Sequence, residues 1–154
     1  MTIIDEFSKG TDYDFLSNFY PSTIWVDGKS WPTVEHAYQA YKTLNEKSRE
    51  LIRKSANPAI AKKLGRGVEI RQDWHVIKEM LMRDFIRKKF ESPFLAERLI
   101  KTGDAELIYG NTWNDRFWGV CRGTGENWLG KILMDVRKEL IQEITDNVLY
   151  SFEK

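Results

Sequence analysis

The chain has 154 residues and a formal net charge of +1, with 42% hydrophobic and 31% charged residues. Its 8 Phe, 6 Trp and 6 Tyr residues can bury enough surface to exclude a mainly disordered chain. No apolar run approaches the roughly 18–20 residues that a membrane helix needs, and the single cysteine, Cys121, excludes an internal disulfide. Because the acidic N-terminus lacks the layout of a signal peptide, we expect a cytoplasmic protein in which Cys121 is buried.

The charges are unevenly distributed along the chain. Residues 42–101 contain 16 Lys or Arg and 8 Asp or Glu, whereas the remainder contains 8 and 15. A basic segment of this kind attracts phosphates or nucleic acid. Lysines and arginines on the solvated faces of amphipathic helices would give the same pattern, and this alternative stays open.

The first 31 residues are predicted to be extended. Residues 24–31 predict a hairpin, since the central Asp27-Gly28 pair tolerates the positive φ angles of a tight turn. Pro32 suits the entry to a helix that runs to about Leu44, with Thr33 as a competing cap.

Capping residues mark four further helices along the chain. We expect them at 46–54 after Asn45, at 58–65 after Asn57, at 74–90 after Asp73, and from Ser92-Pro93 to Gly103. In the long third helix we expect an apolar face towards the core, made by Ile77, Met80, Leu81 and Phe85.

The last helix is predicted from about Asn127 to Ile144, because apolar residues recur there at helical spacing. They are Leu129, Ile132, Leu133, Val136, Leu140 and Ile144. Residues 106–125 read as short strands and glycine-broken loops. The sequence therefore predicts a helix-dominated α+β fold with small β-sheet elements, in a single domain over residues 1–154 whose last ten residues form a tail.

The helix after Pro32 has an unusual polar face. Glu35, Tyr38, Gln39 and Lys42 are spaced i, i+3, i+4 and i+7, which places an acid, a phenol, an amide and an amine on one side. Glu35 lies in the first turn, where the helix dipole favours a carboxylate. These residues suit acid–base chemistry, although a solvated face with a weak ion pair fits the spacing as well.

Residues 110–119 form a second candidate site. Asn114, Asp115 and Gly119 are typical of turns that present side chains and N–H groups to ligands. Trp118, together with Trp74, offers a flat face on which a base can stack. Burial of both indoles in the core, and a capping role for Asp115, are the structural alternatives.

Other chemistries have little support. Gly123 and Gly125 precede a predicted helix N-terminus, which suits an anion, but the Gly-Lys-Ser/Thr arrangement of a P-loop is absent. His36 and His75 lack metal-ligand spacing, so we expect no metal or cofactor and interpret His36 as a packing or hydrogen-bonding residue.

Five blocks of the sequence form an ordered set. They are Ser17-Asn18-Phe19-Tyr20, Trp31-Pro32-Thr33-x-Glu35-His36-x-x-Gln39-Ala40-x-Lys42, Arg71 to Trp74 with Lys78 and Met82, Asn114-Asp115-x-x-Trp118-Gly119, and Asn127-x-Leu129-Gly130. This set resembles the motifs of the NADAR family, also called the YbiA-like family, over about residues 6–142. The resemblance implies a helix-rich, metal-independent N-glycosidase that cleaves the bond between a ribose and a nitrogenous group.

Within that family, one branch hydrolyses ribosylamino-pyrimidine phosphates of riboflavin biosynthesis, and another removes ADP-ribose from guanine bases. Val120-Cys121 replaces a more glycine-rich stretch of the riboflavin branch, so the substrate stays open. The resemblance implies Glu35, Lys42 and Asp115 as catalytic residues, and a lysine-linked route through an opened ribose would use Lys42. The implied substrate-binding residues are Asn18, Phe19, His36, Tyr38, Gln39, Trp74, Asn114, Trp118, Gly119 and Asn127.

Two other classes of function remain as alternatives. The same stacking residues and loops would serve a module that binds ADP-ribose or a nucleotide without turnover. A nucleic-acid-binding domain would instead use the basic segment, and its binding would depend steeply on salt.

Overall fold

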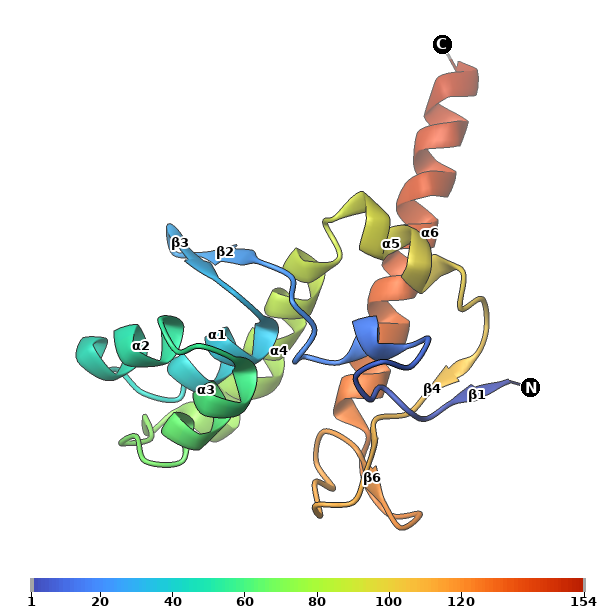
Figure 1. Cartoon of the computed structure of the whole chain (residues 1–154). Coiled ribbons are helices and arrows are strands. Elements are labelled where there is room, and N and C mark those ends of the chain that lie inside the picture. Colours follow the sequence, from blue (N-terminus) through green and yellow to red (C-terminus); the bar gives the residue numbers. More distant parts are fainter. Residues whose placement is uncertain (1, 154) are drawn as a thin grey trace. The chain divides into compact units, whose positions relative to one another are not determined.

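The computed structural model describes residues 2–153, which form two compact units (Figure 1). Residues 17–89 form one, called here the middle unit, and residues 2–16 with 90–153 form the other, the terminal unit. The described residues contain six α-helices and three two-stranded sheets, which confirms the helix-dominated α+β fold with small sheets. The prediction of a single domain concerns both units together and stays a prediction.

The middle unit begins with the predicted hairpin. Strands β2 (Ile24–Val26) and β3 (Lys29–Trp31) pair antiparallel, with Ile24 opposite Trp31. Asp27 and Gly28 between them have φ angles of 51° and 76°, as a primed turn requires. The only other strand in residues 2–31 is β1 (Ile3–Ile4), and a 3₁₀ turn covers Asp14–Leu16, so the expectation of a wholly extended N-terminal segment is wrong.

Four helices complete the middle unit: α1 (Val34–Ala40), α2 (Glu46–Arg53), α3 (Pro58–Gly65) and α4 (Trp74–Lys89). The side chains of Thr33, Asn45 and Asn57 accept N–H groups at the starts of α1, α2 and α3, which confirms the predicted asparagine caps and selects Thr33 over Pro32 as the residue that starts α1. Helix α1 packs against α2, α3 and α4. It therefore lies at the centre of this unit.

Helix α1 ends at Ala40, four residues before the predicted end at Leu44. Donors from outside α1 bond to the carbonyl groups of Lys42 and Thr43. The N–H of Arg71 donates to the carbonyl of Lys42 at 2.8 Å, and Nε of Arg49 donates to that of Thr43 at 2.7 Å. The N–H groups of Lys42 and Thr43 themselves donate to carbonyls only three residues back, so the chain leaves the α-helix after Tyr41, and no local signal announced this.

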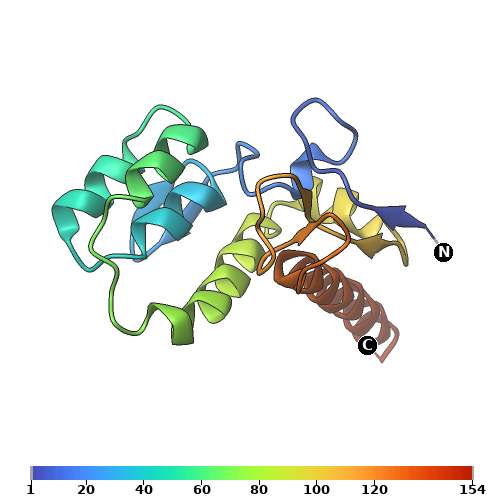
Figure 2. The ribbon, with the colours of Figure 1, turned by 90° about the horizontal axis from the view of Figure 1, so that it is seen from below.

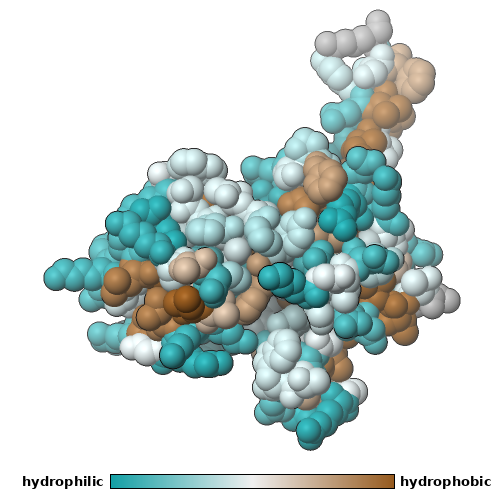
Figure 3. Space-filling view, in the orientation of Figure 1, coloured by the Kyte–Doolittle hydropathy of each residue, from teal (hydrophilic) through white to brown (hydrophobic). Residues whose placement is uncertain are grey.

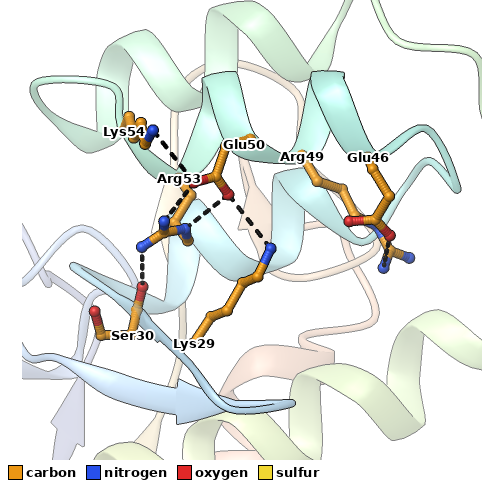
Figure 4. A network of polar contacts seen from close by, with 7 residues as sticks. All are labelled: Lys29, Ser30, Glu46, Arg49, Glu50, Arg53 and Lys54. Atoms are coloured by element: carbon orange, nitrogen blue, oxygen red, sulfur yellow. Dashed lines mark hydrogen bonds and ion pairs between the residues drawn. The ribbon is translucent and has the colours of Figure 1, made fainter.

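A polar network joins the hairpin to α2 (Figure 4). Arg53 forms two hydrogen bonds with the carboxylate of Glu50 and donates to the carbonyl of Ser30 at 3.4 Å. Lys29 and Lys54 lie 3.6 and 3.5 Å from the same carboxylate. Hydrogen bonding to Arg53 lowers the pKa of Glu50 to about 2. The carboxylate therefore stays ionised and keeps these contacts well below neutral pH.

The core face of α4 differs from the predicted one. Met82, Phe85 and Ile86 are buried, but Met80 is 59% exposed. At 100° per residue Met80 lies almost opposite Met82, so the prediction for Met80 is wrong and that for Phe85 is confirmed. Ile77 and Leu81 are partly exposed at the edges of the buried face.

The terminal unit contains two parallel strand pairs and two helices. Strand β1 pairs with β4 (Glu106–Leu107), and β5 (Gly110–Asn111) pairs with β6 (Val120–Cys121). Figures 1 and 2 show α5 (Pro93–Ile100) beside α6 (Trp128–Glu153). Ser92 caps α5 and Cys121 is buried, as predicted.

Helix α6 is longer than predicted. Leu129, Ile132, Leu133 and Val136 are buried as expected. The helix then continues to Glu153, so the predicted tail is helical, and residues 141–153 are all exposed, including Ile144. Brown side chains on this part of α6 are visible near the C terminus in Figure 3. Within residues 2–153, no helix combines the length and apolar character needed to cross a membrane.

Candidate active site

The polar face of α1 lies inside the middle unit. All seven residues of α1 are buried, and the side chains include Glu35, with 7% of its surface exposed, and Gln39, with 3%. A solvated face is therefore the wrong interpretation of these two residues. Burying a carboxylate costs free energy unless hydrogen bonds compensate it, so the contacts around Glu35 determine what it can do.

Gln39 supplies a hydrogen bond to the Glu35 carboxylate. Its Nε2 atom donates to Oε1 of Glu35 at 2.7 Å, one helical turn away. The backbone N–H of Glu35 donates to the carbonyl of Asn18 at 3.1 Å, which joins the first turn of α1 to the preceding segment. The carboxylate is thereby held in one orientation by its own helix.

Lys42 lies two residues beyond the end of α1 and is half-buried. Its Nζ atom lies 5.4 Å from the centre of the Tyr38 ring, a cation–π distance. Burial lowers the pKa of Lys42 below its ordinary value, while the charge of Glu35 raises it. The neutral amine is therefore easier to form here than on an exposed lysine.

Three further cations surround Lys42. Lys62 lies on the last turn of α3, Arg66 directly follows that helix, and Lys78 lies on α4. Their positive charges also lower the pKa of Lys42, after the larger effects of burial and Glu35. Sequence reasoning missed Lys62 and Arg66 as site residues; their i, i+4 spacing at the end of a capped helix was the available signal.

Aromatic rings and Asn18 complete the group in the middle unit. The rings of Tyr38 and Trp74 lie 5.2 Å apart at 54°, and Trp74 is buried against Tyr38. Phe19 is partly exposed, with Nζ of Lys62 6.0 Å from its ring centre. Nδ2 of Asn18 donates to the sulfur of Met82 at 3.5 Å, and its buried Oδ1 has no hydrogen-bond partner in residues 2–153. That oxygen is therefore a buried acceptor whose hydrogen-bonding capacity is unused by the described residues.

His36 is part of the packing around α1. Its Nδ1 lies 2.8 Å from Oγ1 of Thr33 and its Nε2 lies 3.2 Å from the carbonyl oxygen of Ser55. Burial lowers the pKa of His36. The interpretation as a packing and hydrogen-bonding residue is confirmed, and a role in substrate binding stays a prediction.

The remaining predicted site residues lie in the terminal unit. Oδ1 of Asp115 accepts the N–H of Trp118 at 2.9 Å, and the N–H of Asp115 donates to Oδ1 of Asn111 at 2.9 Å. Asn114 is exposed with a φ of 67°, and Trp118 is buried. The turn role of Asp115 is thus observed, and its catalytic role stays a prediction.

Gly119 and Asn127 shape the same loop. A Cβ atom at residue 119 would lie 2.1 Å from the carbonyl oxygen of Tyr109, so only glycine fits. The Asn127 side chain donates to the carbonyl of Leu107 and accepts the N–H of Tyr109, both at 2.9 Å. These contacts account for both residues structurally.

The structure brings together seven predicted residues of the middle unit, which are Asn18, Phe19, Glu35, Tyr38, Gln39, Lys42 and Trp74, whereas the His36 ring of the same unit contacts Thr33 and Ser55 instead. The terminal unit contains the other predicted residues, which are Asn114, Asp115, Trp118, Gly119 and Asn127. Residues 2–153 contain no cluster of three or more His, Cys, Asp or Glu side chains suited to a metal ion. What the middle unit offers is a buried carboxylate near a half-buried amine, with aromatic rings and cations beside them.

Comparisons with known proteins agree on one family. The NADAR domain model matches residues 6–141. N-glycosidase YbiA of Escherichia coli is 43% identical over 146 residues, which cover 92% of this chain and 91% of that protein. A riboflavin biosynthesis protein of Vibrio vulnificus is 39% identical over 142 residues, covering 90% of this chain and 38% of that protein. The NMR structure of Escherichia coli YbiA is similar with a TM-score of 0.84 and 42% identity, covering 94% of this chain and 88% of that one.

Proposed function

Since the chain belongs to the NADAR family, we propose that it is an N-glycosidase that hydrolyses the bond between C1 of a phosphorylated ribose and an amino nitrogen of a pyrimidine. The similarity to N-glycosidase YbiA supports the reaction type. The riboflavin biosynthesis protein of Vibrio vulnificus supports a ribosylamino-pyrimidine phosphate as substrate rather than ADP-ribose on guanine. The observation that carries the proposal is the buried Glu35 carboxylate, held by Gln39, near the half-buried Lys42.

Glu35 stabilises the positive charge that develops on the sugar. Breaking the C1–N bond leaves electron deficiency at C1, and a fixed carboxylate in a site with little water offsets it. The hydrogen bond from Gln39 keeps this carboxylate oriented before substrate arrives. Glu35 therefore acts on the transition state more than on the ground state.

Lys42 acts as an amine on the ring-opened substrate. In that form C1 is doubly bonded to the pyrimidine nitrogen, and the lone pair of Nζ adds to C1. The two protons of Nζ pass to the pyrimidine nitrogen as its bond to C1 breaks, so the pyrimidine leaves as a free amine and C1 becomes doubly bonded to Nζ. Water hydrolyses the remaining lysine imine to the aldehyde of ribose phosphate and restores Lys42. The lowered pKa of Lys42 supports this role because only the neutral amine is nucleophilic.

Lys62, Arg66 and Lys78 bind the phosphate in this proposal. They are close enough to Lys42 for their charges to affect it, and they lie on α3, at its end, and on α4. A phosphate dianion beside them gains charge-assisted hydrogen bonds. The exposed ring of Phe19 beside Lys62 provides a face for the pyrimidine.

Asp115 is a second candidate carboxylate. Asp115→Asn keeps an oxygen that accepts the N–H of Trp118, so this change leaves the turn intact. A loss of hydrolysis well beyond tenfold in this variant would indicate a catalytic carboxylate, since turn geometry alone is preserved.

One comparison tests the proposed reaction. The purified chain is incubated in parallel with a ribosylamino-pyrimidine phosphate and with DNA that carries ADP-ribose on guanine. We expect release of the free pyrimidine amine and ribose phosphate from the first only. Release of ADP-ribose from the DNA alone would move the enzyme to the other substrate class, and tight binding of either ligand without turnover would indicate a binding module.

Borohydride tests the role of Lys42. Reduction during turnover should trap the lysine imine as a stable adduct on Lys42, detected by mass spectrometry of the peptide. Lys42→Arg keeps the positive charge but cannot form the imine, so we expect it to be inactive and unlabelled. A variant Lys42→Arg that retains turnover would instead assign Lys42 a purely electrostatic role.

A further inference from the structure

Gly65 lies directly against the side chain that holds Glu35. It is the last residue of α3, it is buried, and α3 packs against α1. A Cβ atom on residue 65 would lie 1.9 Å from Oε1 of Gln39 and 2.7 Å from its Cδ. The backbone of Gly65 has no left-handed φ, so the chain conformation does not require glycine. The requirement is the space that the Gln39 amide occupies.

The two ends of the Gln39 amide have different surroundings. Nε2 donates to Oε1 of Glu35 at 2.7 Å. Oε1 faces Gly65 and has no hydrogen-bond partner within residues 2–153, although only 3% of the surface of Gln39 is exposed. Turning the amide over would place its oxygen against the carboxylate, where two acceptors repel. The observed orientation is therefore the one that gives Glu35 a donor, and the space at Gly65 permits it.

We propose that Gly65 is a positioning residue of the reaction: the missing side chain leaves room for the Gln39 amide, which in turn orients the Glu35 carboxylate. This inference rests on the proposed function, because it assigns a role in the step that Glu35 assists. In this inference Gly65 acts only through Gln39, although the two residues lie on different helices, α3 and α1.

Gly65→Ala is the direct test. The methyl group overlaps most with the far end of a flexible side chain, which can move, and its contact with Cβ of Gln39 at 3.0 Å needs a shift of only a few tenths of an ångström; alanine also suits a helix better than glycine. We expect an unchanged or higher melting temperature, a kcat lower by about ten- to a hundredfold, and a KM within about twofold of wild type. Gln39→Met, which has similar length and no donor, should lower kcat to a similar extent.

The two changes form a double-mutant cycle. Once Gln39→Met has removed the donor, Gly65→Ala has no hydrogen bond to Glu35 left to disturb, and we expect no additional loss of kcat. Gly67→Ala is the matched control, because a Cβ there would meet only the carbonyl oxygen of Leu64 at 3.7 Å. That variant should keep full activity. Equal losses from Gly65→Ala in both backgrounds, or full activity of Gly65→Ala, would overturn the inference.

A second readout needs no substrate. In ¹H–¹⁵N NMR spectra, the Nε2 protons of Gln39 should exchange slowly in the wild-type protein, because they are buried and one of them is hydrogen-bonded, and rapidly in Gly65→Ala. If the wild-type chain hydrolyses no ribosyl substrate but this exchange difference is found, the proposed function fails while the contact from Gly65 to Glu35 stands. If exchange is the same in both proteins, the positioning role fails, whatever the substrate.

Discussion

Two helical segments depart from the usual amphipathic pattern in opposite directions. They are α1 and residues 141–153 of α6, called here the distal part of α6. In α1 all seven residues are buried, including an acid and an amide. In the distal part every residue is exposed, including Val148, Leu149 and Phe152. A helix at a protein surface ordinarily buries one apolar stripe and exposes the polar remainder.

The two departures differ in free energy. Exposed apolar side chains are common on protein surfaces and cost little, whereas a buried carboxylate is expensive and needs compensating contacts. Sequences break such rules at functional sites. The NADAR model ends at residue 141, where the exposed part of α6 begins. Function is therefore expected to depend on α1 and to be insensitive to the distal part of α6.

Glu35→Gln should give the largest effect. It keeps the shape of the side chain and an oxygen that accepts from Nε2 of Gln39, but it removes the negative charge. We expect kcat to fall by about 10²–10⁴-fold with little change in melting temperature. Single-turnover release of the pyrimidine amine measures the loss.

The matched control for this change is Glu97→Gln. Glu97 lies on α5, is mostly exposed and pairs with Lys101 at 3.0 Å. Removing such a pair should leave kcat unchanged, since exposed ion pairs contribute little. Similar losses in both variants would mean that the buried carboxylate has no special role, and the contrast between α1 and the rest of the chain would fail.

Two substitutions within α6 test the same comparison by their effects on the free energy of unfolding. Ile132 is fully buried, and Ile132→Ala should lower the free energy of unfolding by about 2–5 kcal/mol. Val148 is half-exposed, and Val148→Ala should change it by less than about 0.5 kcal/mol. Urea titrations followed by circular dichroism measure both. A large loss in Val148→Ala would show that the distal part of α6 is covered in solution.

The features predicted correctly from the sequence are those fixed by neighbouring residues. Asp27-Gly28 specifies the hairpin because both positions need positive φ. Asn45, Asn57 and Ser92 specify helix starts because each side chain accepts an N–H group three residues later. The polar face of α1 was also predictable from spacing. The NADAR family was identified from the resemblance of five sequence blocks to its motifs, and the comparisons confirm it.

The features that were missed depend on distant residues. Helix α1 ends at Ala40, and the carbonyls of Lys42 and Thr43 accept hydrogen bonds from Arg71 and Arg49, so Lys42 lies beyond the helix and not on it. Lys62 and Gly65 join the candidate site only because α3 packs against α1. Spacing and capping place Lys62 and Arg66 together at the end of α3, but they cannot reveal which helix that end contacts.

The pH dependence of kcat tests whether the partial burial of Lys42 matters. Burial and nearby cations lower the pKa of Lys42, and the neutral amine reacts, so kcat should rise with pH below the ordinary range of lysine. Lys78→Met removes one of these cations. The pKa of Lys42 should then rise, and the rising limb of the profile should move to higher pH.

Lys138→Met on the surface of α6 is the control for that shift and should leave the profile in place, because Lys138 is exposed. The measurement is kcat at saturating substrate, since loss of a phosphate-binding cation also raises KM. If the rising limb of the pH profile is the same in Lys78→Met as in the wild type, the titrating group is not Lys42.

Removal of residues 142–154 should have the smallest effect of all. The side chains described in this stretch are exposed, and the buried Leu129, Ile132, Leu133 and Val136 remain, as does the hydrogen bond from Arg137 to Thr102 at 2.8 Å. A new carboxylate near the end of a helix is slightly unfavourable, so the free energy of unfolding should fall by less than about 1 kcal/mol, with kcat unchanged. Removal from Leu133 onwards, which also deletes core residues, should prevent folding. If the shorter deletion alone abolished turnover, the distal part of α6 would be required for function. Burial would then no longer distinguish the functional part of this chain from the rest.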